Sequence, residues 1–246
     1  MAINWGTGVV GGVIGALATA GLMFGAASFG YFPAPSDKQF RGWLLGHPSI
    51  IYEMRDQAEV DAFNAEERHI QDNVDKLGTK TFLDPKLAYV AGPKDAKKTL
   101  VEFFDYNCAH CRHNFPILKK FYEKHKGDTQ FAFIELPIFG DASNDAARSA
   151  LAARRQEGKY IPFHFAMMGQ KNAIGPAETI DAAQKAGLDV NKLMTDLKDP
   201  SIAKQMASAH ALAQRIGLTG TPLFIINGKV HSGEVTEAEL KQLTES

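Results

Sequence analysis

The chain has 246 residues, an apolar fraction of 45% and a formal net charge of −1 at pH 7. This length allows one or two globular domains. The near-neutral charge, without a Lys/Arg stripe interleaved with aromatic residues, argues against nucleic acid as a partner. Both cysteines of the chain, Cys108 and Cys111, lie in one short stretch.

The N-terminal 36 residues carry no charged side chain, and every residue from Val9 to Phe32 is apolar or small. A membrane-spanning helix needs roughly 20 such residues. Trp5 and Tyr31 near the ends of the run favour an uncleaved anchor in the inner membrane of a bacterium. The alternative is a cleaved signal peptide, favoured by the Ala18-Thr19-Ala20 pattern. Either interpretation predicts a periplasmic location, where a dithiol can be held oxidised.

Residues 37–80 are predicted to form a helical arm after a Pro-rich break. Phe40, Trp43 and Leu44 fall on one helical face, and Phe63, Ile70, Val74 and Leu77 form a later stripe. The arm is too thin to bury these stripes by itself. It is therefore expected to pack on the following domain or on another copy of the chain, unless it is only a spacer.

Residues 81–246 have the pattern of an α/β domain. Thr99–Phe104 and Gln130–Leu136 are predicted strands on either side of a helix that runs from Cys108 to about Lys126. The order strand, helix, strand predicts a parallel pair.

The rest of this domain is helical and then returns to strands. A helical insertion is expected over about residues 141–217. A strand at Pro222–Ile226, an Asn227-Gly228 hairpin turn, a strand at Lys229–His231 and a helix at Thr236–Leu243 should follow. The predicted architecture is a thioredoxin-like fold with an inserted helical domain.

The two cysteines occur as Cys108-Ala-His-Cys111, directly after the first predicted strand. A bridge across two residues closes almost no loop and contributes little stability, so a redox couple or part of a metal site is expected. At a helix N-terminus the Cys108 sulfur faces free backbone N–H groups, which lower its pKa below the ordinary value of about 8.5. Cys108 is then the attacking thiol and Cys111 the resolving thiol.

Three nearby residues bear on this pair. His110 is expected to add a hydrogen-bond donor and positive charge beside Cys108, unless it is a solvent-exposed loop histidine. Strand alternation points Glu102 inward, where burial raises its pKa and lets it take a proton from Cys111; the alternative is a glutamate that reaches water. Asp105 ends the strand and is expected to be solvated.

Thr221-Pro222 precedes a predicted strand, where proline is tolerated at the start. A cis peptide at this bond could bring Thr221 beside the cysteines and leave its backbone free to pair with an extended substrate. The alternative is an ordinary trans proline that opens a strand.

These stretches, VEFFDYNCAHC and GLTGTPLFIING with a helical insertion between them, resemble the DsbA-like family of thioredoxin-fold disulfide oxidoreductases. The nearest subgroup is that of the suppressor-of-copper-sensitivity protein C and Com1-like proteins, which the GWLLGHPSIIYE stretch also resembles. The resemblance implies that Cys108 and Cys111 are the redox pair, Pro222 the cis-proline, Thr221 a substrate contact and Glu102 the buried acid.

The implied activity is thiol–disulfide exchange on cysteine-containing envelope proteins, as oxidase or isomerase, without a cofactor. A membrane redox partner and a homo-oligomer formed through the arm are implied as well. His110 between the cysteines resembles the strong oxidases, whereas Thr221 before the proline resembles the isomerases. The alternative function is copper or zinc binding through Cys108, His110, Cys111 and His113.

Overall fold

The computed structural model describes residues 36–245. These residues divide between Asp61 and Ala62 into two units. The hydrophobic segment predicted as an anchor or signal, residues 9–32, lies outside the described residues. Within residues 36–245, no helix is both long enough and apolar enough to cross a bilayer.

The predicted arm is helical. Helix α2 covers Asp37–Gly46, and helix α3 covers Ser49–Leu77. Ser36 caps α2: its hydroxyl accepts from the Gln39 N–H, and the Gln39 side chain accepts from the Ser36 N–H. Within residues 36–61, large apolar side chains are at least half exposed, among them Phe40, Trp43, Leu45, Ile51, Tyr52, Met54 and Val60.

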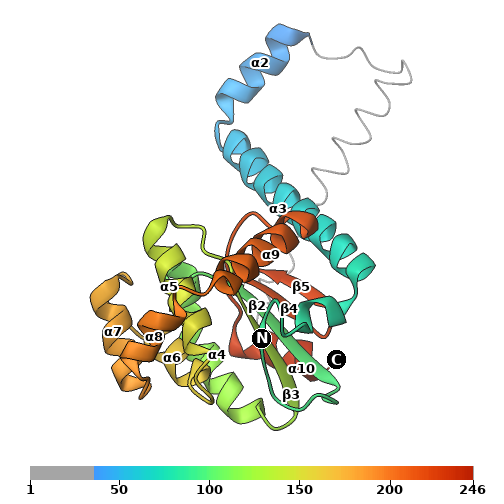
Figure 1. Cartoon of the computed structure of the whole chain (residues 1–246). Coiled ribbons are helices and arrows are strands. Elements are labelled where there is room, and N and C mark those ends of the chain that lie inside the picture. Colours follow the sequence, from blue (N-terminus) through green and yellow to red (C-terminus); the bar gives the residue numbers. More distant parts are fainter. Residues whose placement is uncertain (1–35, 246) are drawn as a thin grey trace, which may run out of the picture. The chain divides into compact units, whose positions relative to one another are not determined.

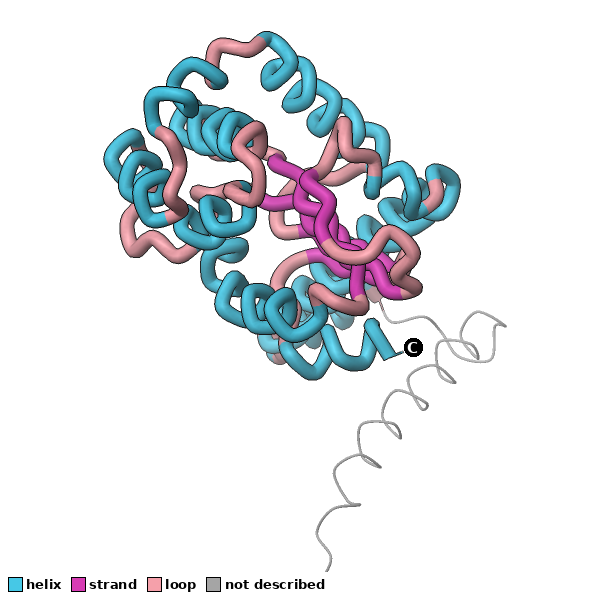
Figure 2. Tube along the Cα trace, turned by 60° about the horizontal axis from the view of Figure 1, so that its bottom comes forward, coloured by secondary structure: helices cyan, strands magenta, loops and turns pink. Residues whose placement is uncertain are grey.

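A five-stranded sheet lies at the centre of the second unit, with helices on both of its faces (Figure 2). Its order is β1-β3-β2-β4-β5. The strands are β1 Tyr89–Ala91, β2 Lys98–Phe104, β3 Thr129–Glu135, β4 Leu223–Ile226 and β5 Lys229–Ser232. The β2–β3 pair is parallel, as predicted, and the β4–β5 hairpin turns at Asn227-Gly228. Strand β1 is too short to show an alternating pattern, and the sequence did not predict it.

The central strands alternate between two buried faces, since helices cover both sides of the sheet. Leu100 and Phe104 pack in one core with Phe131 and Phe133 of β3. The intervening residues Val101 and Phe103 pack in the other core with Ala132 and Ile134. Both cores are built around the same sheet, so β2 carries the site residues on a rigid support.

The remaining helices follow the predicted order (Figure 1). They are α4 Ala109–His125, α5 Asp141–Ala153, α6 Tyr160–Met168, α7 Pro176–Lys185, α8 Val190–Asp196, α9 Pro200–Ile216 and α10 Glu237–Glu245, with a short 3-10 helix at Thr79–Leu83. Helices α5 to α9 form the predicted insertion between β3 and β4. Gly217 ends α9 with φ of +80°, a conformation that favours glycine.

The part of α3 after Asp61 packs on the domain. Ile70 and Val74 are buried in the same core as Ile216 of α9. The Gln71 side chain accepts from the Val230 N–H and donates to the Gly228 carbonyl, and Glu67 accepts from the Ser232 N–H. These contacts satisfy backbone groups of the edge strand β5, which would otherwise be open to pairing with another chain. The predicted packing of the second stripe is thus confirmed at Ile70 and Val74, whereas Phe63 is 50% exposed.

Candidate active site

The two cysteines lie where β2 gives way to α4. Cys108 is the N-cap residue of α4, with extended backbone, and Cys111 lies in the first turn. Both are free thiols and both are buried. The loop before them is tied down, because the Cys108 N–H donates to the Asp105 carbonyl at 3.1 Å. The predicted position of Cys108 at a helix N-terminus is confirmed.

Thr221 and Pro222 lie beside Cys108 although they are more than a hundred residues away in sequence. The Thr221-Pro222 peptide bond is cis, one of the two alternatives that the sequence left open. The Cys108 thiol donates to the Thr221 carbonyl at 3.2 Å. While Cys108 is a thiol, the Thr221 hydroxyl is buried without a hydrogen-bond partner. Once Cys108 is a thiolate, its sulfur can accept a hydrogen bond from the Thr221 hydroxyl.

Several donors lower the pKa of the Cys108 thiol to about 5. The largest cause is a hydrogen bond from the Cys111 thiol, which is opposed in part by burial. The Thr221 side chain and the backbone N–H groups of Cys111 and His110 add to the lowering. Since the ordinary thiol pKa is about 8.5, this lowering favours the thiolate form of Cys108 at neutral pH.

The pKa values of Cys111 and Glu102 are raised, whereas that of Cys108 is lowered. Burial raises the pKa of the Cys111 thiol, and the hydrogen bond to Cys108 and the Glu102 charge raise it further. Glu102 is 1% exposed and one of its oxygens has no hydrogen-bond partner. Burial, and then the Cys108 charge, raise the pKa of Glu102 to about 8. The predicted inward orientation of Glu102 is confirmed, and burial shifts its pKa in the predicted direction.

His110 is exposed, with 74% of its side chain accessible, yet it has a fixed partner. Its Nδ1 lies 2.8 Å from Glu234 of the loop between β5 and α10, and the other Glu234 oxygen lies 2.7 Å from His113 Nδ1. Glu234 was not predicted as a site residue, because its contacts with α4 span more than a hundred residues.

Asp105 is not solvated, and that expectation is wrong. Its side chain is 2% exposed because the loop after β3 folds over it. One carboxylate oxygen accepts from the Ile138 and Phe139 N–H groups, and the other accepts from Asn107. Asp105 thereby fixes the turn that leads from β2 into Cys108.

A second buried acid, Glu135, lies at the end of β3, opposite Phe104 in the register. Tyr160 donates a hydrogen bond to it, and burial raises its pKa to about 7. Tyr106 and His164 form a neighbouring buried contact of 3.0 Å, and burial lowers the pKa of His164 to about 3. Between about pH 3 and pH 7 these groups are neutral, and none of them was predicted from the sequence as a site residue.

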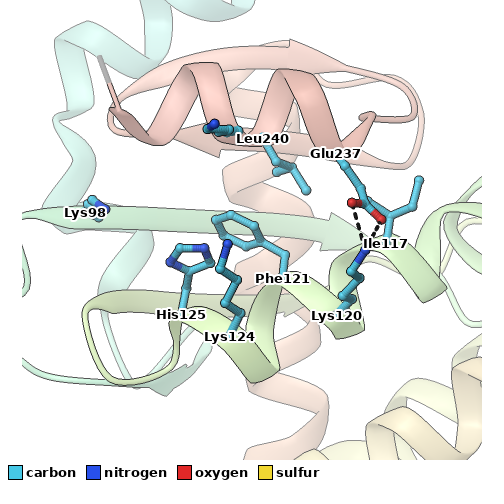
Figure 3. A pocket seen from close by; sticks show the side chains of 9 residues that line it. Lys98, Ile117, Lys120, Phe121, Lys124, His125, Glu237 and Leu240 are labelled. Carbon is cyan, nitrogen blue, oxygen red and sulfur yellow. Dashed lines mark hydrogen bonds and ion pairs between the residues drawn. The ribbon is translucent and has the colours of Figure 1, made fainter.

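Three of the predicted site residues border a groove. His110, Thr221 and Pro222 line it together with Glu234 and with Phe63 and Glu66 of α3. A different pocket lies between α4 and α10, lined by Lys98, Lys124, His125 and Leu240 among others (Figure 3). No predicted site residue lines this second pocket, so we do not assign it to the site.

The alternative of a copper or zinc site needs several converging ligands. In the described part of the chain, no three His, Cys, Asp or Glu side chains are grouped so that they could hold a metal ion. His110 and His113 instead share the carboxylate of Glu234.

Known proteins are similar to this chain in sequence and in fold. Residues 99–244 match the family model of the DSBA-like thioredoxin domain. A thioredoxin-like oxidoreductase from Silicibacter pomeroyi DSS-3 is 34% identical, with a TM-score of 0.63 over 68% of this chain and 96% of that one. The catalytic domain of Proteus mirabilis ScsC is 25% identical, with a TM-score of 0.62 over 71% of this chain and 96% of that one.

Two relatives found by sequence similarity match this chain over very different shares of their own length. Disulfide bond formation protein D of Bacillus subtilis (strain 168) is 26% identical over 167 residues, which cover 63% of this chain and 75% of that protein. The Na(+)/H(+) antiporter NhaA of Herminiimonas arsenicoxydans is 29% identical over 147 residues, which cover 60% of this chain. The chain spans only 23% of the length of that antiporter.

Proposed function

The chain belongs to the family of DSBA-like thioredoxin domains, and from this premise we propose that it is a thiol–disulfide oxidoreductase in which Cys108 and Cys111 are the redox pair. The likeness to ScsC agrees with the subgroup that the sequence resembles. The observation that carries the proposal is the Cys108 sulfur. It lies at the start of α4, against the carbonyl of Thr221, with its pKa lowered to about 5.

The proposed reaction moves two electrons and two protons. In oxidation, a substrate thiolate attacks Cys108 of the disulfide form; the Cys108–Cys111 bond breaks and Cys111 leaves as a thiolate that takes a proton. A second substrate thiolate then attacks the substrate sulfur that is bound to Cys108. This forms the substrate disulfide and releases Cys108 as a thiolate. In isomerisation, the Cys108 thiolate attacks a wrong substrate disulfide, and a different substrate thiol displaces it.

Three further residues have proposed roles in these steps. Glu102 exchanges a proton with Cys111, because it is buried and its pKa is raised to about 8. Thr221 and Pro222 present backbone at the groove for an extended substrate segment. His110 supplies positive charge near Cys108 when it is protonated, and this stabilises the thiolate and hence the reduced form.

We expect the reduced protein to titrate as one thiolate with a midpoint near pH 5. The ultraviolet absorbance of the thiolate, or the rate of alkylation by iodoacetamide, measures this as pH is varied. The Cys111→Ala variant should show a higher midpoint, since the largest stabilising hydrogen bond is lost. A midpoint at the free-cysteine value of about 8.5 would remove the proposed nucleophile.

The proposed setting is the bacterial periplasm. The run from Val9 to Phe32 would anchor the chain in the inner membrane, or be cleaved as a signal peptide, and the substrates would be cysteine-containing envelope proteins. Such an enzyme needs a redox partner to renew its working state. A membrane protein of that kind is part of the proposal.

The arm is proposed to join copies of the chain. Its apolar side chains are exposed at Phe40, Trp43 and Leu45, and burial of such area drives association. We expect light scattering of the chain from residue 37 onward to give a mass above that of a monomer, and a Trp43→Glu variant to lower it. A dimer or trimer favours isomerisation of misfolded substrates. A monomer would contradict the assembly and favour the oxidase direction.

A further inference from the structure

The loop that joins β5 to α10 bridges the two halves of the site. The Gly233 N–H donates to the Pro222 carbonyl at 3.0 Å. On the other side, the buried Asn114 side chain of α4 donates to the Val235 carbonyl at 2.6 Å and accepts from the Val235 N–H at 3.0 Å. The backbone between these contacts is therefore fixed against both the cis-proline segment and the cysteine helix.

Glu234 lies between these two anchors and reaches α4. Its oxygens lie 2.8 Å from His110 Nδ1 and 2.7 Å from His113 Nδ1. The two histidines are three residues apart and so share a helix face. Because an ionised carboxylate only accepts hydrogen bonds, each imidazole must carry its proton on Nδ1 here. One side chain thus fixes the tautomer and the direction of both rings.

His110 connects Glu234 to the reactive sulfur. The hydrogen bond to Glu234 is the largest cause that raises the pKa of His110, and the Cys108 charge acts in the same direction. The same attraction means that the imidazolium favours the Cys108 thiolate, in addition to the His110 backbone N–H, which lowers the pKa of the Cys108 thiol. The Glu234 carboxylate contacts His110 and His113, so the proposed route of its influence on the sulfur is the His110 imidazole. Glu66 of α3 also lines this groove, and it accepts from the Thr219 hydroxyl.

This inference rests on the proposed function, in which Cys108 is the nucleophile. We propose that Glu234 is a positioning residue that holds protonated His110 near the Cys108 sulfur. It thereby sets how oxidising the Cys108–Cys111 disulfide is. A held imidazolium stabilises the thiolate, which belongs to the reduced form. Stabilising the reduced form makes the disulfide a stronger oxidant. Neutral His110 offers no such charge.

The test is the equilibrium of the protein with glutathione. Two glutathione thiols reduce the protein disulfide, supply two electrons and two protons, and form one glutathione disulfide. Glu234→Gln keeps the shape of the side chain and removes its charge. Near neutral pH we expect the equilibrium to move toward the protein disulfide by about two- to fivefold, the range for charge pairs exposed to solvent. Near pH 5, where histidine is protonated in either protein, the shift should be smaller.

A nuclear magnetic resonance titration provides a second readout. In the reduced protein, the midpoint for His110 should fall toward the ordinary histidine value in Glu234→Gln. In a His110→Ala background, Glu234→Gln should no longer move the glutathione equilibrium, because the connecting imidazole is absent.

Glu237 offers a matched control. It is the first residue of α10, three residues after Glu234, and pairs with Lys120 of α4 at 2.7 and 2.9 Å, beside the second pocket rather than the cysteines (Figure 3). Glu237→Gln should leave both readouts unchanged. The proposal is overturned if Glu234→Gln behaves like Glu237→Gln, or if its effect persists without His110. The glutathione equilibrium needs no protein substrate, so a failure of the proposed function appears separately, as wild-type protein without catalysis of disulfide exchange.

Discussion

Replacing Cys108 with alanine should abolish catalysis of disulfide formation and of disulfide reshuffling in a reduced or scrambled substrate protein. Every proposed step forms or breaks a bond to this sulfur, and no other cysteine besides Cys111 exists in the chain. Cys111 cannot replace it, since burial raises the pKa of the Cys111 thiol and keeps it protonated. Loss of a covalent nucleophile costs a factor of about 10³ or more. Recovery of activity of a disulfide-containing test enzyme measures the loss.

The Cys111→Ala variant should behave differently and serve as the matched partner. It keeps the nucleophile but cannot form the internal disulfide, so mixed disulfides between Cys108 and substrate should accumulate. Mass spectrometry under non-reducing conditions detects them. Both variants replace a buried thiol with a smaller apolar group, so thermal unfolding of each verifies that the fold is kept. Normal catalysis by a folded Cys108→Ala variant would disprove the assignment of the nucleophile.

The parts of the site that follow from local pattern were predictable. A Cys-Ala-His-Cys stretch between a strand and a helix places Cys108 at a helix N-terminus, whatever the rest of the fold. Alternation along β2 points Glu102 to the same side as Leu100 and Phe104, and the structure buries it there. The same rule applied to β3 places Glu135 with Phe131 and Phe133. The signal for the second buried acid was therefore present in the sequence.

Other parts depend on contacts that no local pattern contains. Asp105 has the position of a solvated strand end, yet the N–H groups of Ile138 and Phe139 come from a loop more than thirty residues later. Glu234 follows a short edge strand in a polar loop and is recognisable only once Asn114 has fixed that loop on α4. Strand β1 is formed by pairing with β3, because three residues are too few for their own periodicity to indicate a strand.

The second large effect concerns the pH dependence of stability, and it comes from Glu102. Its pKa in the folded protein is about 8, against an ordinary value of 4.5. Between these values the folded state holds a proton that the unfolded state has lost, so the free energy of unfolding falls as pH rises from about 4.5 to 8. We expect Glu102→Gln to remove this loss and to be more stable than wild type by roughly 5 kcal/mol above pH 8, since each pKa unit corresponds to about 1.4 kcal/mol. Urea unfolding of the reduced protein at several pH values measures it.

Glu135→Gln is the control that separates stability from chemistry. Glu135 is also buried, and its pKa is raised to about 7 by burial, so its replacement should likewise flatten part of the pH dependence. It lies at the end of the neighbouring strand and accepts a hydrogen bond from Tyr160. We do not propose that it exchanges a proton with Cys111. Only Glu102→Gln should slow the step in which Cys111 gains or loses its proton, by about 10²-fold as for other general acid–base groups. If Glu102→Gln keeps the wild-type pH slope, Glu102 is already ionised in the folded protein, and it cannot store the proton that Cys111 requires.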